Sequence, residues 1–227
     1  VIKNSIFTHN HAIGYGGGLY YYGYCDVKDS IFAINSAEKG GGLYSFSKYL
    51  TITNSIISSN TASKNGAGMH IGYGAISNLI IKDNNATLDG GGIYSSWSTT
   101  LISNVLFLSN SNALYISNNE NSIVANSIFV DNNNSDISGG INTKVTLDNN
   151  YLDIANVSVT NFKSNNIFSG VTLGFVNEAE GDYQLTASST FIEAGTDKYF
   201  DKFIVDDRTA PYPYEKIRLL EIDFANN

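Results

Sequence analysis

The residue types that could perform chemistry in this sequence are carboxylates, histidines and aromatic rings. Residues 1–176 contain ten Asp and Glu, eight Lys and no Arg. Two carboxylates on adjacent turns of a fold could act as an acid–base pair. The candidates for such a pair are Asp26 with Asp29, and Asp131 with Asp148 or Asp153. Their spacings do not recur as a paired site would require, so we predict no catalytic residue.

Metal ligands are equally sparse. His9, His11 and His70 could approach one another only by assumption, and the single cysteine, Cys25, permits neither an internal disulfide nor a cysteine-based zinc site. We therefore predict no metal site and no cofactor. Weak Ca²⁺ binding by exposed carboxylates remains an alternative.

A series of aromatic residues is the strongest candidate for binding. Its members each follow an apolar residue in a recurring motif: Tyr20, Tyr44, His70, Tyr94 and Tyr115. Because side chains alternate along a strand, this series is predicted to form an exposed column on the outside of a sheet. Tyr22, Tyr24 and Phe46 would widen it at one end. The column is either a stack of like residues or a contact face for sugar rings or a partner protein.

Composition limits the classes of partner. The chain has 227 residues, of which 42% are apolar and 15% charged, and its formal net charge is −8. No basic stripe could neutralise phosphates, so a nucleic acid is not expected as partner. Its apolar runs are far shorter than the roughly 18 to 20 residues of a membrane helix, and we predict no transmembrane segment. The sequence begins at Val1, and we expect either a removed leader or a piece of a longer chain.

These candidate residues lie within an internal repeat. The motif Asn4-Ser5-Ile6-Phe7-Thr8-His9-Asn10 returns with steps of 25, 25, 24, 26 and 22 residues. Each period also contains a block like Gly16-Gly17-Gly18-Leu19-Tyr20 and an apolar residue two positions before the Asn/Asp start. Sustained helical spacing is missing. Three short strands per period are therefore predicted, separated by Asn, Ser and Gly.

Apolar residues recur at three positions of the period. These columns are Ile6, Ile31, Ile56, Ile80, Leu106 and Ile128; Phe7, Phe32, Ile57, Ile81, Phe107 and Phe129; and Leu19, Leu43, Met69, Ile93 and Leu114. We expect all three to line a continuous core between stacked turns.

The predicted fold is therefore all-β: a right-handed parallel β-helix of about seven turns over residues 1–176, each turn of 22–26 residues holding three short strands. Residues 177–227 have no copy upstream and are predicted to form an irregular C-terminal cap packed on the last turn. A leucine-rich repeat and a β-propeller fit the motif and the period less well.

The repeated polar residues are predicted to be structural. Asn10, Asn35, Asn60, Asn84, Asn110 and Asn132 are expected at a corner with left-handed backbone angles, their amides bonded in a ladder along the stack. The series from Asn4 to Asn126 should do similar work at another corner. The glycine triplets lack the following helix and Lys-Ser/Thr of a phosphate loop, so we expect them to allow positive φ and close approach of turns.

The pairing of Phe-x-x-Asn with Gly-Gly-Gly/Ala-Leu/Ile/Met resembles the repeats of polymorphic outer-membrane proteins and adhesin-like proteins, within the pectate-lyase-like β-helix superfamily. The segment from Asn165 to Gly195 is similar to the end of β-helix proteins with a choice-of-anchor region. This resemblance implies a secreted or surface-bound protein. The motifs of polysaccharide lyases and polygalacturonases in that superfamily are missing from the coils.

The expected function is an adhesive or structural role at the cell surface or outside the cell. Its partner would be a surface glycan, a protein or other copies of itself. One alternative is a polysaccharide-active lyase or hydrolase of the same superfamily. A second is a subunit that stacks end to end into an extracellular filament.

Overall fold

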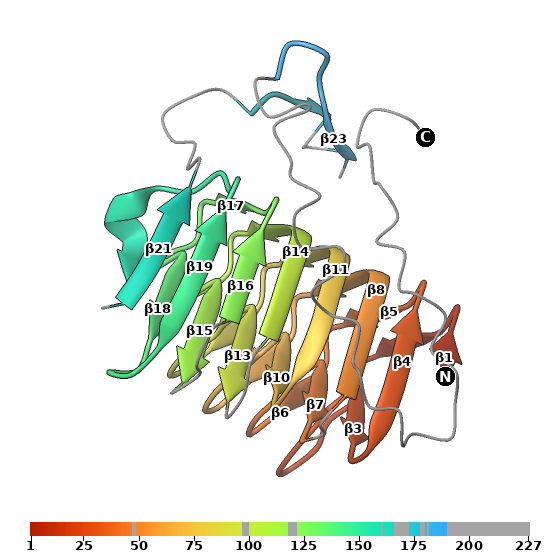
Figure 1. Ribbon diagram of the computed structural model, residues 1–227. Helices are drawn as coiled ribbons and strands as arrows, with labels where there is room; N and C mark the ends of the chain where they lie inside the picture. The colour runs from red at the N-terminus through yellow and green to blue at the C-terminus, as the bar shows by residue number, and fades with distance from the viewer. Residues whose placement is uncertain are drawn as a thin grey trace, which may run out of the picture. The chain divides into compact units, whose positions relative to one another are not determined.

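The protein is a parallel β-solenoid in a computed structural model (Figure 1). The structure describes residues 1–46, 49–96, 100–117, 122–159, 161–165, 173–177, 180 and 182–189. The chain divides into two compact units, Val1–Val171 and Thr172–Asn227. Most of the expected cap, residues 177–227, lies outside the described residues, and its packing on the last turn stays a prediction.

The largest sheet holds two of the three predicted segments of each turn. All of its neighbouring strands pair in parallel. Its strands are β1 (Ile2–Lys3), β2 (Ile6–Thr8), β4 (Tyr24–Lys28), β5 (Ile31–Ala33), β8 (Tyr49–Ser58), β11 (Gly74–Lys82), β14 (Thr100–Leu108), β16 (Ser122–Ala125), β17 (Ile128–Val130), β19 (Lys144–Asp148) and β21 (Asn161–Asn165).

A second parallel sheet contains the Gly-Gly-Gly-Leu-Tyr segments. It comprises β3 (Leu19–Tyr21), β7 (Leu43–Ser45), β10 (Met69–Ile71), β13 (Ile93–Ser96), β15 (Leu114–Ser117), β18 (Ile137–Gly139) and β20 (Val157–Ser158). A short third sheet, which the sequence did not predict, consists of β6 (Ser36–Ala37), β9 (Thr61–Ala62) and β12 (Asn85–Ala86). The predicted fold class is confirmed, and the solenoid has about six turns where about seven were predicted.

Two short elements lie outside these sheets. A 3₁₀ turn, η1 (Ile154–Asn156), begins after Asp153, whose carboxylate accepts a hydrogen bond from the Ala155 amide at 2.9 Å. In the second unit, β22 (Phe175–Asn177) pairs antiparallel with β23 (Asp182–Leu185). In the described residues no helix has the length and apolar character needed to cross a membrane.

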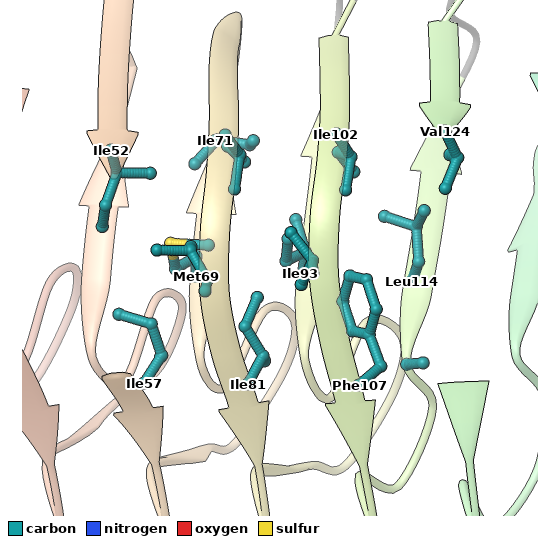
Figure 2. Close-up of a cluster of buried hydrophobic side chains, with 14 of the residues drawn as sticks. Ile52, Ile57, Met69, Ile71, Ile81, Ile93, Ile102, Phe107, Leu114 and Val124 are labelled. Atoms are coloured by element: carbon teal, nitrogen blue, oxygen red, sulfur yellow. The ribbon is translucent and has the colours of Figure 1, made fainter. Parts of the chain in front are cut away.

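The core lies between the large and the second sheet, where like residues of successive turns stack in rows. Figure 2 shows Ile57, Ile81 and Phe107 in one row and Met69, Ile93 and Leu114 in another. All six are essentially inaccessible to solvent. The Phe7–Phe32 and Phe107–Phe129 ring pairs stack at 4.7 and 4.6 Å between centroids. The predicted Phe7 and Leu19 columns are thus core columns.

The prediction that the Ile6 column also lines the core is wrong. Ile6 is 70% exposed, and the equivalent residues of the next three turns are only half-buried. Phe7 and its equivalents point inward, so the preceding residue on the same strand must point to the outer face of the large sheet. Leu106 and Ile128 of this column are buried, yet they are not part of the core cluster.

The predicted asparagine ladder is confirmed. The Oδ1 atom of Asn60 accepts from both the backbone amide and the Nδ2 of Asn35, at 2.9 and 3.0 Å, and its own Nδ2 donates to Asn84 at 3.0 Å and to the Phe32 carbonyl at 2.9 Å. The same pattern recurs at Asn35, Asn84 and Asn110, and Asn10 begins the ladder by donating its backbone amide and Nδ2 to Asn35. These bonds satisfy the polar groups of a buried column.

The left-handed backbone angles lie one residue away from their predicted place. The residue before each ladder asparagine has the positive φ, as in Ile34 (φ 57°) and Ser59 (φ 54°). The second polar column, which includes Asn54 (φ 50°), is itself left-handed. Asn54 Nδ2 donates to Asp29 at 3.3 Å, so this column also forms part of a ladder.

Two glycine positions of the triplet have separate geometric causes. Gly40 has φ +66°, a conformation that L side chains rarely adopt. Gly42 faces the next turn so closely that a Cβ atom there would lie 2.6 Å from the Gly68 carbonyl oxygen and 3.0 Å from Nδ2 of Asn60. The first glycine therefore permits the corner, and the third permits the close approach of the turns.

Replacing Gly42 with alanine should lower the free energy of unfolding by about 2 kcal/mol or more, because the methyl group displaces a carbonyl oxygen and a ladder amide. Gly14→Ala is the matched control, since its Cβ would meet nothing within 4 Å. The control should change stability by less than about 1 kcal/mol. Urea unfolding of both variants measures this, and equal effects would contradict the proposed packing.

Candidate functional site

The predicted aromatic series forms a continuous stack along the second sheet. The parallel register pairs Tyr20 with Tyr44, Tyr44 with His70, His70 with Tyr94 and Tyr94 with Tyr115. The ring centroids of these four pairs are 5.6, 4.8, 4.7 and 4.9 Å apart, with interplanar angles of 26° or less. The rings are therefore stacked face to face.

The prediction that the whole column is exposed is wrong at its centre. Tyr44 and His70 are only 8% and 6% exposed, while Tyr94 and Tyr115 are half-buried and Tyr20 is 52% exposed. Stacking contributes to this burial, because Tyr44 and His70 each have a ring on both faces, and the Tyr15 ring also lies 4.7 Å from Tyr44. An outward direction along a strand therefore did not guarantee exposure. The inner rings offer at most their edges to a ligand.

Exposed aromatic rings gather instead on the first two turns. We call the exposed group Tyr15, Tyr20, Tyr22, Tyr24 and Phe46 the aromatic patch; each of its residues has about half or more of its surface exposed, and Tyr22 reaches 73%. Tyr22 and Phe46 follow equivalent strands, β3 and β7, by one residue, and the Phe46 amide donates to the Tyr21 carbonyl at 3.3 Å. The sequence had singled out four of these five residues and missed Tyr15.

Tyr15 joins the patch from the segment that precedes β3. Its ring lies 4.7 Å from Tyr44 and 6.4 Å from Tyr20, and it forms a parallel bridge to Lys39 of the next turn. Tyr15 belongs neither to a recurring motif nor to a strand, so the sequence repeat did not single it out.

Charges beside the aromatic patch are mostly paired. Lys28 lies 3.2 Å from Asp26, which also accepts a hydrogen bond from Thr51 at 2.7 Å. The Lys39 ammonium group lies 5.9 Å from the centroid of the Tyr15 ring, within the range of a cation–π contact. The patch thus combines apolar rings and phenol hydroxyls with little unpaired charge.

Burial changes the acid–base behaviour of the stack. Desolvation, and secondarily the positive charge of Lys39, lower the pKa of His70 from 6.5 to about 4. Its Nε2 lies 3.4 Å from the Ser96 hydroxyl, and among the described residues its Nδ1 has no hydrogen-bond partner. Burial also raises the pKa of Tyr44, with smaller contributions from Tyr15 and Tyr20. His70 is therefore a neutral stacking residue at pH 7.

The structure keeps the three histidines in separate contacts. His9 bonds Thr8 and His11 bonds Ser36, both at 2.8 Å, whereas His70 lies in the stack. No group of three or more His, Cys, Asp or Glu side chains close enough to hold a metal ion occurs among the described residues. Weak Ca²⁺ binding stays a prediction that nothing here tests.

The acidic candidates likewise have individual structural contacts. Asp29 accepts from Asn54, Asp153 caps η1, and Asp148 is buried on β19, where it pairs in register with Ala125 of β16. Asp131 has a left-handed backbone at a corner, with φ 51°.

A buried carboxylate that sequence reasoning missed is Asp136, which ends the asparagine ladder. It is buried, and its two oxygens accept from Asn132 Nδ2 at 3.1 Å and from the Asp153 amide at 3.3 Å. Burial raises its pKa, although both hydrogen bonds act in the opposite direction. A carboxylate only accepts, so it satisfies the last amide of the ladder without adding N–H groups that need partners.

Comparisons with protein-family models, with curated proteins and with solved structures found no match for this chain. The structure shows a parallel β-solenoid, and the finer family resemblance drawn from the repeats stays a prediction.

Acidification should destabilise the protein through His70. Its pKa is about 4 in the folded chain and near 6.5 when unfolded, so the unfolded state binds the proton more readily. The resulting stability is present above pH 6.5 and is lost as the pH falls to 4, an effect of about 3 kcal/mol. Urea unfolding at pH 7 and pH 4 measures it.

The control variant is His70→Tyr, which gives the stack a tyrosine like those of the neighbouring turns. Its stability should fall by about 3 kcal/mol less on acidification than that of the original protein. Asp89 and Asp136 have raised pKa values and opposite pH dependence, but they are common to both proteins and cancel in the comparison. An equal fall in both proteins would contradict the assignment to His70.

Proposed function

We propose that this chain is an adhesive or structural β-solenoid of the cell surface or extracellular space, and that its aromatic patch binds the apolar faces of sugar rings in an uncharged glycan. The observation that carries the proposal is the concentration of exposed aromatic rings on two turns. Isolated apolar residues on a surface are common, whereas several large exposed rings on two neighbouring turns are typical of a binding surface.

The chemistry of the patch favours a neutral glycan over an anionic one. Four of its five members, Tyr15, Tyr20, Tyr22 and Tyr24, combine an apolar ring with a hydroxyl group that can bond sugar hydroxyls. The neighbouring Asp26 and Lys28 neutralise each other in an ion pair. An acidic sugar would be expected to need several unpaired cations, and the chain as a whole carries a net charge of −8.

Two further arguments support the general role. The Phe-x-x-Asn and Gly-Gly-Gly motifs resemble repeats of polymorphic outer-membrane and adhesin-like proteins of the pectate-lyase-like superfamily. The composition, poor in charge and rich in Asn, Ser, Gly and Tyr, agrees with a surface location. A rigid stack of parallel strands also presents rings at fixed positions, which limits the entropy lost when a ligand binds.

Glycan-array binding tests the proposal, with affinities then measured on neutral oligosaccharides. The double variant Tyr22→Ala, Tyr24→Ala should bind about tenfold more weakly or worse, because each ring contact contributes about 1 kcal/mol. Ile13→Ala is the matched control, since Ile13 is a highly exposed apolar residue outside the patch. Its binding should be unchanged.

Three results would contradict the proposal: no binding to any neutral glycan, binding that survives the double variant, or an equal loss in the Ile13→Ala control. Release of reducing or unsaturated sugars from a polysaccharide panel would instead favour the lyase or hydrolase alternative. Filaments seen by electron microscopy at increasing concentration would favour end-to-end self-assembly.

A further inference from the structure

We propose that Tyr15 and Tyr44 form an oxidative cross-linking site, at which a peroxidase and hydrogen peroxide join the two phenol rings as dityrosine. This inference is independent of the glycan proposal, because it rests on contacts between tyrosines and not on their exposure to a ligand. It assigns a covalent modification to the boundary between the first and second turns.

The geometry of the two rings supports coupling. Their centroids are 4.7 Å apart and their planes are inclined by 34°, so one edge of each ring lies closer to the other than the centroids do. The other tyrosine pairs that include Tyr20 are more distant, at 5.6 Å to Tyr44 and 6.4 Å to Tyr15. Burial, and to a smaller extent the neighbouring Tyr15 and Tyr20, raise the pKa of Tyr44.

The backbone holds both residues in place. Tyr15 forms a parallel bridge to Lys39, and the Gly16 amide after it donates to the Lys39 carbonyl at 3.0 Å. Tyr44 lies on β7, which pairs with β3 on one side and β10 on the other. Fixed neighbouring reactants behave as though highly concentrated, so coupling within the molecule should outcompete coupling between molecules.

Oxidant can reach the site although Tyr44 is buried. Tyr15 and Tyr20 are each about half exposed, so a peroxidase can oxidise both. The Tyr20 ring is stacked on Tyr44 with an interplanar angle of 10°. A Tyr20 phenoxyl radical can therefore take an electron and a proton from Tyr44, which restores the Tyr20 phenol and leaves the radical on Tyr44.

The reaction is balanced by one molecule of hydrogen peroxide. Each phenol loses one electron and one proton to give a phenoxyl radical. The two radicals form one carbon–carbon bond between ring positions ortho to the hydroxyls, and the two ring hydrogens move to oxygen and restore both phenols. Hydrogen peroxide, reduced by the peroxidase, takes up the two electrons and two protons lost by the phenols, and its two oxygens leave as two molecules of water.

The test is treatment of the folded chain with horseradish-type peroxidase and hydrogen peroxide, followed by trypsin digestion and mass spectrometry. Cleavage after lysine places Tyr15 in peptide 4–28 and Tyr44 in peptide 40–48, where Tyr44 is the single tyrosine. We expect these two peptides to be joined, with the mass of two hydrogen atoms lost and with dityrosine fluorescence in the monomer fraction.

Phenylalanine variants identify the residues while preserving the rings. Tyr15→Phe and Tyr44→Phe should each abolish the joined peptides, and Tyr20→Phe should slow their formation without abolishing it. Tyr22→Phe is the matched control, because Tyr22 is the most exposed tyrosine of the patch and should not affect the link. Equal thermal midpoints of all four unoxidised variants confirm that each has folded.

Three outcomes would overturn the proposal. The first is no joined peptide although exposed tyrosines have been oxidised, and the second is cross-linking only between separate molecules. The third is a link that persists in Tyr15→Phe, which would assign the bond to another tyrosine. None of these outcomes bears on glycan binding by the untreated protein, so the two proposals fail separately.

Discussion

Register between successive turns is the constraint on which the rest of this structure depends. If a parallel strand shifted by one residue, the side chains on its inner and outer faces would be exchanged. A shift of any size would also separate the like side chains that stack between turns. The asparagine ladder opposes such shifts directly, because each Oδ1 accepts both the backbone amide and the Nδ2 of the same residue one turn away. Gly42 tightens the same register by admitting no side chain between turns.

The same register determines which aromatic ring faces are covered by neighbouring rings. Residues at equivalent positions are brought within about 5 Å, so planar side chains there stack and cover each other's faces. His70 lies between Tyr44 and Tyr94 for this reason, although it points away from the core. A ring face stays uncovered by a neighbouring ring where a column starts or ends, or where the ring comes from a segment outside the columns. Tyr20 and Tyr15 are examples of these two situations.

Periodic features could be predicted from the sequence, and aperiodic ones could not. The solenoid, the inner Phe7 and Leu19 columns and the asparagine ladder all follow from residues that recur at a fixed step. The Ile6 column was wrongly predicted to line the core, because apolar residues can recur on the outer face of a sheet as well as on the inner one. Tyr15 and Asp136 occur once, and their roles depend on which neighbours the folded chain brings to them. The buried state of Tyr44 needed knowledge of ring contacts that a strand pattern does not contain.

At the end of the asparagine ladder, a residue that occurs only once completes a column of recurring residues. Each ladder Nδ2 donates to the Oδ1 of the asparagine on the following turn, so the last asparagine needs a different acceptor. The Nδ2 of Asn132 donates to the carboxylate of Asp136, four residues later in the sequence, and not to an asparagine of the next turn. The raised pKa of Asp136 reflects the cost of burying this carboxylate. Another asparagine there would avoid that charge but would add N–H groups that need partners, whereas the carboxylate accepts without adding donors.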